Sequence, residues 1–229
     1  MNSLLTGVVL MASLAPGALP PKALLYLPVL QEQIVQGWPG APMPETMAGQ
    51  IEQETCITMT HSSCWNPRAE IKTDREYGFG FVQITVTKQF NNFEGVKKLD
   101  AKLQSWKWQD RFDPARQLRA AVVLDRTGFA KCSFAATDAD RMAFMYAAHN
   151  GGLGGVMQDR QLTRGKGADP NRWFGQVEKY SFKAKIKVKG YGKSFFEINR
   201  EYVRNIMLVR SAKYRPFFCK KTLDRSIGS

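Results

Sequence analysis

The spacing of apolar residues along most of the chain is that of amphipathic helices. Apolar positions recur every three or four residues, and this period predicts helices over 24–36, 45–56, 114–128, 138–149 and 195–210. Pro44 and Pro114 stand where two of these helices begin, a position that favours proline. Gly128 is expected to end the helix that begins at Pro114, and the Asn-Gly-Gly run at 150–152 to end the helix over 138–149. The pattern therefore indicates a mainly helical protein.

Two stretches break the helical period. Residues 78–87 (GFGFVQITVT) join a glycine-rich turn to an apolar segment, after an irregular stretch over 57–77. Residues 182–189 (FKAKIKVK) place a lysine at every second position, and this period of two predicts a strand with one basic face. The fold class that follows is mainly α within an α+β fold, one helical domain with a small β-hairpin or strand excursion.

The first 20 residues are apolar and leave two interpretations open. No Lys or Arg precedes Lys22, so the basic region that opens a secretory signal is missing. Gly and Pro interrupt the apolar run before it reaches the length of a transmembrane helix. An ordinary buried helix is favoured, and a targeting or membrane-contacting segment is the alternative.

Composition excludes some classes of protein, and charge points to others. The chain has 229 residues, 44% of them hydrophobic and 23% charged, which excludes a disordered, collagen-like or polytopic membrane protein. Its net charge is +13, and residues 1–100 carry −2 while residues 101–229 carry +15. This split suggests chemistry in the first half and an attracting surface in the second. Nucleic acid, an anionic membrane and an acidic envelope polymer are the candidate partners.

The cysteines do not define a metal site. They stand at 56, 64, 132 and 219, none forms a CxxC pair, and the chain has two histidines. Cys56 and Cys64 could form a local disulfide if the protein matures outside the cytoplasm, and four reduced thiols are the alternative. A zinc site from these two cysteines and His61 fits no usual ligand spacing. We therefore expect no metal and no cofactor.

Four separated motifs carry a family resemblance. They are QET at 53–55 with WNPRA at 65–69, GFGFVQI at 78–84, AHNGG at 148–152 and REYVRNI at 200–206. In this order they resemble the Gln-Glu-Ser with Asn-Pro-x-Ala, Gly-Leu-Met-Gln-Ile, Ala-Tyr-Asn-x-Gly and Arg-x-Tyr-Val-x-Asn-Val elements of the lytic transglycosylase and goose-type lysozyme superfamily. The resemblance extends over about residues 45–207 and implies a lysozyme-like catalytic domain that cleaves peptidoglycan.

The resemblance assigns roles to individual residues. Glu54 would be the general acid, because cleavage of a glycosidic bond requires protonation of the leaving oxygen. Tyr202 would reach back to this carboxyl. The matching family segment, which lines the sugar site, makes Gly80, Phe81 and Gln83 candidate substrate-binding residues, and Asn150 would bind the N-acetyl or hydroxyl groups.

Each assignment has a structural alternative. Glu54 could be a solvated helical carboxylate, as Glu52 beside it is expected to be. Gln83 could bond the backbone, Asn150 could simply end a helix, and Tyr202 could be a core aromatic. His149 occupies the position of the family's usual Tyr, and we place it outside the catalytic set because an isolated His is more often structural.

The motifs leave the type of reaction open between a lytic transglycosylase and a hydrolase. A hydrolase needs a second carboxylate or another group that positions water. The run DREYGFG at 74–80 resembles the goose-type Asp-Arg-Gly-Asn-Gly-Phe-Gly, which makes Asp74 the candidate and Glu76 a neighbour worth testing. The NPRA and Tyr-Val elements favour a transglycosylase, with Glu54 acting first as acid and then as base to give a 1,6-anhydro product.

The expected organisation is one catalytic domain over 1–229, with N-terminal helices or a membrane or targeting segment over 1–44 and a basic tail over 208–229. The architecture resembles a bacteriophage endolysin, a bacteriolytic and antimicrobial enzyme made in the host cytoplasm that acts as a monomer on the periplasmic wall. Expected partners are glycan strands and the anionic envelope, with membrane contact through 1–20 as an option. A virion-associated wall-piercing protein is an alternative. A nucleic-acid binder using the lysines of 183–189 is another, although no nucleic-acid motif appears.

Overall fold

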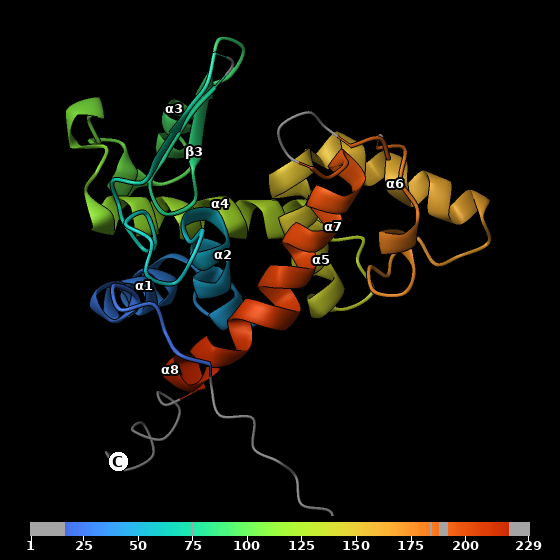
Figure 1. Ribbon diagram of the computed structural model, residues 1–229, viewed down its shortest axis with the longest axis horizontal. Coiled ribbons are helices and arrows are strands. Elements are labelled where there is room, and N and C mark those ends of the chain that lie inside the picture. The colour runs from blue at the N-terminus through green and yellow to red at the C-terminus, as the bar shows by residue number, and fades with distance from the viewer. Residues whose placement is uncertain (1–16, 75, 184, 188–191, 220–229) are drawn as a thin grey trace, which may run out of the picture.

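The structure is a computed structural model that describes residues 17–74, 76–183, 185–187 and 192–219. It confirms a mainly helical fold with a small antiparallel sheet (Figure 1). The α-helices are α1 (Ala23–Gly37), α2 (Glu45–Thr55), α3 (Asn92–Lys97), α4 (Pro114–Lys131), α5 (Asp138–Gly151), α6 (Leu153–Gly165), α7 (Phe195–Arg204) and α8 (Arg215–Cys219). The strands are β1 (Glu70–Lys72), β2 (Glu76–Phe79) and β3 (Ile84–Thr87), and short 3-10 helices are η1 (Ala101–Leu103), η2 (Trp108–Asp110), η3 (Val177–Lys179) and η5 (Ser211–Tyr214).

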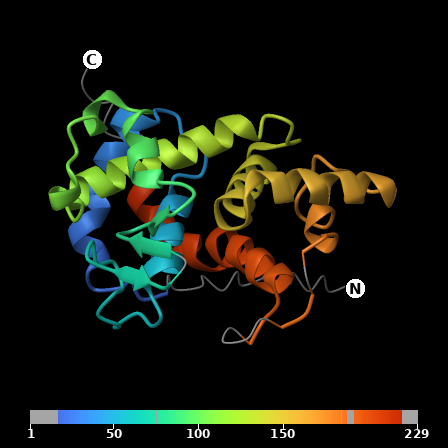
Figure 2. The ribbon, with the colours of Figure 1, turned by 90° about the horizontal axis from the view of Figure 1, so that it is seen from above.

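The elements form two groups that α4 connects. Figure 2 shows α1, α2 and the sheet on one side and α5 and α6 on the other, with α4 extending from one group to the other. Helix α1 packs on α4, and α5 packs on α4, α6 and α7. The buried apolar residues of both groups belong to one continuous core. The site described below lies where the two groups face each other.

The predicted helices are confirmed, and their first turns show why they start where they do. Asp113 accepts a hydrogen bond from the backbone of Arg116 at 2.8 Å and caps α4, and Thr137 caps α5 in the same way. Ser194 and Glu197 form a reciprocal capping box on α7. Gly128 was expected to end a helix, but α4 continues to Lys131.

The sheet occupies part of the stretch that was expected to be irregular. Strand β2 pairs antiparallel with β1 and with β3, with Gly78 opposite Ile71 on one side and opposite Thr85 on the other. The turn between β2 and β3 contains Gly80 at φ +78° and Gln83 at φ +48°. This left-handed backbone turns the hairpin sharply above α2.

The predicted strand over 182–189 is wrong for the residues that the structure describes there. Residues 182, 183 and 185–187 have no strand geometry, and 184, 188 and 189 lie outside the described residues. The buried carboxylate of Asp159 holds the start of this segment. It accepts hydrogen bonds from Ser181 Oγ at 2.8 Å and from the Phe182 backbone at 3.2 Å, and Lys183 Nζ lies 3.4 Å away. These local bonds replace a strand ladder.

The expected basic tail is a packed segment as far as the structure describes it. Helix α7 continues into a π-helix, η4 (Asn205–Arg210), which packs against α2 together with η5. Glu52 anchors this segment. Its side chain is 1% exposed, forms ion pairs with Arg210 at 2.7 Å and Lys213 at 2.8 Å, and accepts a hydrogen bond from Tyr214. The expectation that Glu52 is solvated is therefore wrong.

Cys56 and Cys64 form a disulfide directly after α2. This excludes them as zinc ligands and overturns the alternative of four reduced thiols, while Cys132 is free and buried. Within the described ranges, no three or more His, Cys, Asp or Glu residues gather where they could hold a metal ion. In the same ranges, no helix has the length and apolar character needed to cross a membrane. The N-terminal interpretations concern residues 1–20, of which 1–16 lie outside the described part.

Candidate active site

Glu54 lies in the last turn of α2, with its side chain 16% exposed toward a cleft. The hydroxyl of Tyr202, on α7, donates a hydrogen bond to Glu54 Oε1. Gln50, one turn earlier on α2, donates to the same hydroxyl at 3.5 Å. Burial and the nearby charge of Glu54 hold the pKa of Tyr202 well above its ordinary value, so the hydroxyl keeps its proton. Helices distant in sequence thus orient one carboxyl.

A cleft of about 230 Å³ opens beside Glu54. One wall comes from the β-hairpin and the other from the end of α5. The polar side chains that line it are those of Glu54, Glu76, Gln83, Thr85, His149 and Asn150. This arrangement joins residues from three of the four sequence motifs around one carboxyl, and Tyr202 adds the fourth.

Gln83 is held in a strained conformation at the cleft. Its φ of +48° is unusual for a residue with a side chain, and such strain is stored most often at functional sites. Its amide Nε2 donates to the carbonyl of Gly80 at 2.9 Å. Its buried Oε1 receives no hydrogen bond from the described part of the chain. An acceptor in this state is available to a donor group of a ligand.

Gly80 and Phe81 support the hairpin turn rather than line the cleft. The Phe81 side chain is 0% exposed and packs against Tyr26 with ring centroids 5.0 Å apart. Its backbone N–H donates to Gln117 Oε1 at 3.1 Å. A Cβ at Gly80 would lie 2.4 Å from the same oxygen. Gly80 and Phe81 were predicted to bind substrate, but the residues that line the cleft include neither, and the Phe81 side chain belongs to the core.

Asn150 is exposed at the end of α5 and lines the cleft. Its Oδ1 accepts a hydrogen bond from Nδ2 of Asn199 at 3.0 Å, and Asn199 also donates to the carbonyl of Ala147. Because Asn199 is buried, this bond fixes the orientation of the Asn150 side-chain amide. Asn199 falls just before the fourth motif and has no signal of its own in the sequence.

The two candidate second carboxylates lie in different places. Glu76 is exposed on β2 and lines the cleft with Glu54. Asp74 is exposed in the turn between β1 and β2, and the described residues that line the cleft do not include it. Of the two, Glu76 is the one whose position beside the cleft suits a role in the reaction.

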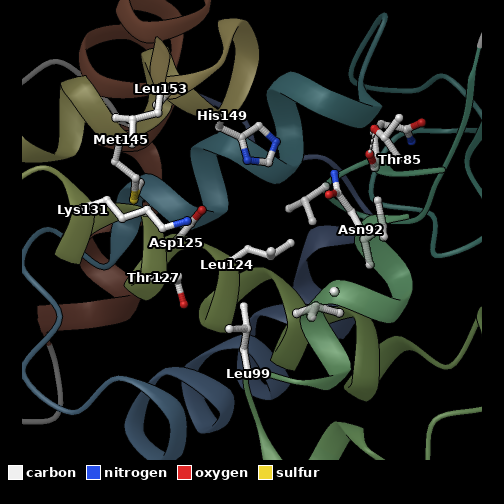
Figure 3. Close-up of a pocket in the computed structure, with 17 residues that line it drawn as sticks. Thr85, Asn92, Leu99, Leu124, Asp125, Thr127, Lys131, Met145, His149 and Leu153 are labelled. Carbon is white, nitrogen blue, oxygen red and sulfur yellow. Dashed lines mark hydrogen bonds between the residues drawn. The ribbon is translucent and has the colours of Figure 1, made fainter. Parts of the chain in front are cut away.

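Two further titratable residues lie at this site: His149, which we placed outside the catalytic set, and Asp125, which sequence reasoning missed. His149 Nε2 lies 3.5 Å from Glu54 Oε1, and its ring is parallel to that of Tyr202 with centroids 6.1 Å apart. Asp125, on α4, is 2% exposed and lines a second cavity with His149 (Figure 3). The departure from the family's Tyr at 149 was a signal for the first residue. The second lies in a helix outside every motif.

The second cavity extends the cleft between the sheet and α4. It has a volume of about 430 Å³ and shares Val82, Gln83, Thr85 and His149 with the cleft at Glu54. In Figure 3, His149 and Asp125 lie on one side of it and Thr85 and Asn92 on the other. Its lining mixes apolar side chains with a few polar ones, as is usual for binding grooves. The two cavities adjoin through these shared residues, and a third cavity adjoins the cleft at Glu54 through Glu76 and Asn150.

Comparison with known proteins finds distant relatives of one kind. The chain is 31% identical over 100 residues to membrane-bound lytic murein transglycosylase F of Vibrio campbellii and 30% identical over 100 residues to that of Vibrio cholerae. It is 25% identical over 170 residues to that of Vibrio vulnificus. The matches cover 42% and 72% of this chain, and the chain spans only 19% to 29% of the length of these relatives. No protein-family model matches. This partial similarity supports a relationship to lytic transglycosylases.

Proposed function

We propose that this protein is a lytic transglycosylase that cleaves the β-1,4 bond between N-acetylmuramic acid and N-acetylglucosamine in peptidoglycan. The observation that carries the proposal is the half-buried Glu54 at the cleft, with Tyr202 donating to its Oε1. The similarity to lytic murein transglycosylases supports the same assignment. The adjoining cavities on both sides of the cleft suit a glycan strand that runs across the carboxyl.

The reaction needs one acid that becomes a base. Protonated Glu54 gives its proton to the glycosidic oxygen, and the bond from this oxygen to C1 of muramic acid breaks. The C6 hydroxyl of the same sugar then bonds to C1 and returns a proton to Glu54, which leaves a 1,6-anhydro product. The N-acetyl group assists at C1. Asn150 and Gln83 line the cleft, which supports a role for both in holding the sugar's polar groups during this sequence.

A hydrolytic lysozyme is the second candidate, and one observation favours a particular form of it. Glu76 lines the cleft with Glu54, so it could position a water molecule on the sugar. Asp74, which the goose-type resemblance suggested, lies in the exposed turn instead. A Glu76→Gln variant that retains anhydro products would exclude this form, whereas products with reducing ends from the unchanged protein would favour it.

Digestion of purified peptidoglycan tests the proposal. We expect muropeptides lighter by one water, measured by mass spectrometry, and a loss of roughly 10²- to 10⁴-fold in rate for Glu54→Gln, because the acid contributes a factor of this size. Glu94→Gln, which changes an exposed carboxylate on α3, is the matched control and should keep full activity. Wall cleavage by Glu54→Gln at the rate of the unchanged protein would contradict both the transglycosylase and the hydrolase.

We further propose a role in bacteriophage lysis, with synthesis in the host cytoplasm and action on the periplasmic wall. The support is the resemblance to endolysins and the net charge of +13, which suits an anionic envelope. Expression of the full chain in bacteria with and without a phage membrane pore tests the role: lysis should require the pore. Deletion of residues 1–20 tests whether this segment delivers the protein. Detection of the chain in purified phage particles would favour the virion-associated alternative.

A further inference from the structure

His149 lies close enough to Glu54 to exchange a proton with it. Its Nε2 is 3.5 Å from Glu54 Oε1, and the side chains of His149 and Glu54 are 25% and 16% exposed. The parallel ring of Tyr202 packs against one face of the imidazole. The ring position is therefore defined by α2, α5 and α7 together.

Asp125 places a second buried carboxyl near His149. It is 2% exposed, and among the described residues none donates a hydrogen bond to its Oδ2. A buried carboxylate with one unsatisfied oxygen is costly even with the Gln50 side chain beside it, so the group is stabilised by a nearby positive charge or by a proton of its own. The charged and titratable groups around His149 are Glu54 on α2, Asp125 on α4, Tyr202 on α7, and Glu76 and Lys131 at the edges of the cavities.

We propose that His149 is a positioning residue that shares one proton with Glu54, and that Asp125 helps to retain this proton in the site. The inference rests on the proposed function, because it concerns the proton that Glu54 must deliver. Glu54, His149 and Asp125 together form a proton cluster.

The shared proton has two positions. It lies on His149 Nε2 when the imidazolium and the Glu54 carboxylate form an ion pair, and on Glu54 when His149 is neutral. Bound sugar removes water from the cleft, which disfavours the two charges and moves the proton to Glu54. Glu54 gives this proton to the glycosidic oxygen and regains one from the C6 hydroxyl, so the number of protons in the cluster is unchanged after each turnover.

The pKa directions agree with this arrangement. Burial by itself would lower the pKa of His149, but the hydrogen-bonding contact and charge of Glu54, together with the charge of Asp125, raise it above its ordinary value. Burial raises the pKa of Asp125 to about 7, against the opposing effect of the His149 charge. The cluster therefore keeps its proton to a higher pH than an isolated carboxyl would.

Titration by NMR tests the sharing without any measurement of activity. The chain has two histidines, and His61 in the exposed loop after α2 serves as an internal reference. In the unchanged protein we expect the His149 Cε1 proton to titrate above the ordinary His value. In Glu54→Gln its midpoint should fall by roughly one pH unit or more, since a neighbouring opposite charge shifts a pKa by about 1–3 units. Asp125→Asn should lower it by less. A His149 midpoint that is the same in Glu54→Gln as in the unchanged protein overturns the proposal.

The pH profile of kcat/KM tests the consequence for catalysis. His149→Gln should lose activity at a lower pH than the unchanged protein, with an alkaline limb shifted by roughly one unit, while activity near pH 5 falls less than tenfold. His61→Gln is the matched control and should keep the profile of the unchanged protein. A uniform loss at every pH would show a purely structural role for His149. If the unchanged protein cleaves no peptidoglycan at any pH, the proposed function fails, and the NMR titration still decides the proton sharing.

Discussion

A single hydroxyl group orients the carboxyl that the proposed reaction depends on. The Tyr202 hydroxyl, on α7, donates to Glu54 Oε1 and accepts from Gln50, and both of these partners lie on α2. The ring itself is buried and would hold its place without the hydroxyl. A variant that lacks only this hydroxyl therefore tests the orientation of Glu54 without changing the packing of the ring.

Tyr202→Phe should lower kcat by roughly tenfold to a hundredfold, because a hydrogen bond to a charged group is worth about 1.5–3 kcal/mol. KM and the unfolding midpoint should change little. Steady-state kinetics on soluble glycan chains, with a urea melt, would measure both. Tyr26→Phe on α1, a partly buried tyrosine packed against Phe81, is the control. An unchanged kcat would show that the hydroxyl does not orient Glu54.

Asp125 makes stability depend on pH in a direction opposite to that of most carboxylates. Its pKa is about 7 in the folded protein and 3.8 ordinarily, so unfolding releases a proton between these values. The Asp125 contribution to the free energy of unfolding therefore falls as the pH rises from about 4 to about 7.

The free energy of unfolding of Asp125→Asn, taken relative to that of the unchanged protein, should rise by on the order of 4 kcal/mol between pH 4 and pH 8. Urea unfolding at both values measures this, with exposed Asp110→Asn as the control; equal differences at both pH values would contradict it.

The β-hairpin depends on one position without a side chain. Gly80 has a φ of +78°, its N–H donates to the carbonyl of Ala69 at 2.8 Å, and a Cβ there would lie 2.4 Å from Gln117 Oε1. Gln117 in turn donates to the carbonyls of Pro67 and Arg111. The glycine thus allows the hairpin to approach α4 closely.

Gly80→Ala should lower the free energy of unfolding by about 2–4 kcal/mol, from the left-handed backbone and the overpacking together. Gly95→Ala, on α3 with nothing within 4 Å of the added Cβ, should instead raise it by about 0.5–1 kcal/mol. Chemical denaturation of both variants tests the pair. Equal effects of the two substitutions would show that the contact with Gln117 is easily relaxed.

The spacing of apolar residues predicted most of the long helices. It did not predict α6, whose buried residues are mostly polar. Helix α6 begins near two glycines and buries Asp159, Arg160 and Thr163, so it lacks an apolar stripe. The same Asp159 draws 181–183 into local bonds, which the alternation of lysines could not indicate. Propensity and period describe apolar faces well, and they do not describe contacts among buried polar groups.

The motifs brought out the polar groups of the site that belong to the family pattern. Glu54, Gln83, Asn150 and Tyr202 all lie at the cleft or reach Glu54. Asp125 could not be found in this way, because on a helix it looks like an ordinary polar position until the fold places it beside His149. The burial of Glu52 depended likewise on Arg210 and Lys213, more than 150 residues away.

Across the whole molecule, folding pairs much of the acidic first half with the basic second half. Asp100 binds Arg119 at 2.6 Å, and Glu52 binds Arg210 and Lys213. In the described part of the second half, other cations remain exposed, among them Lys107, Lys131, Arg164, Lys166, Lys179, Lys185, Lys187 and Arg204. Exposed cations such as these are available to an anionic envelope, whereas Arg119, Arg210 and Lys213 are held in ion pairs.

Activity on whole cell walls should therefore fall severalfold when salt rises from about 0.05 to 0.5 M, because screening shortens the reach of exposed charges. Cleavage of a short soluble glycan should change much less. Turbidity loss of walls and chromatography of the soluble products measure the two. A Lys185→Gln, Lys187→Gln double variant should show a weaker salt dependence on walls and unchanged cleavage of the soluble glycan. Equal salt dependence for both substrates would show that the exposed cations do not recruit the wall.

The π-helix η4 bears on how this chain tolerates insertions and deletions over evolutionary time. A π-helix uses one more residue for each hydrogen-bonded turn than an α-helix. A deletion of one residue within 205–210 would therefore restore an α-helix and leave the residues after it on nearly the same helix face. Tyr214 and Lys213 would still face Glu52, and Tyr202 would still reach Glu54. A deletion of one residue in the α-helical part, α7, would instead rotate everything after it by about 100°. Single-residue gaps among homologous chains are thus expected within 205–210 and not within α7.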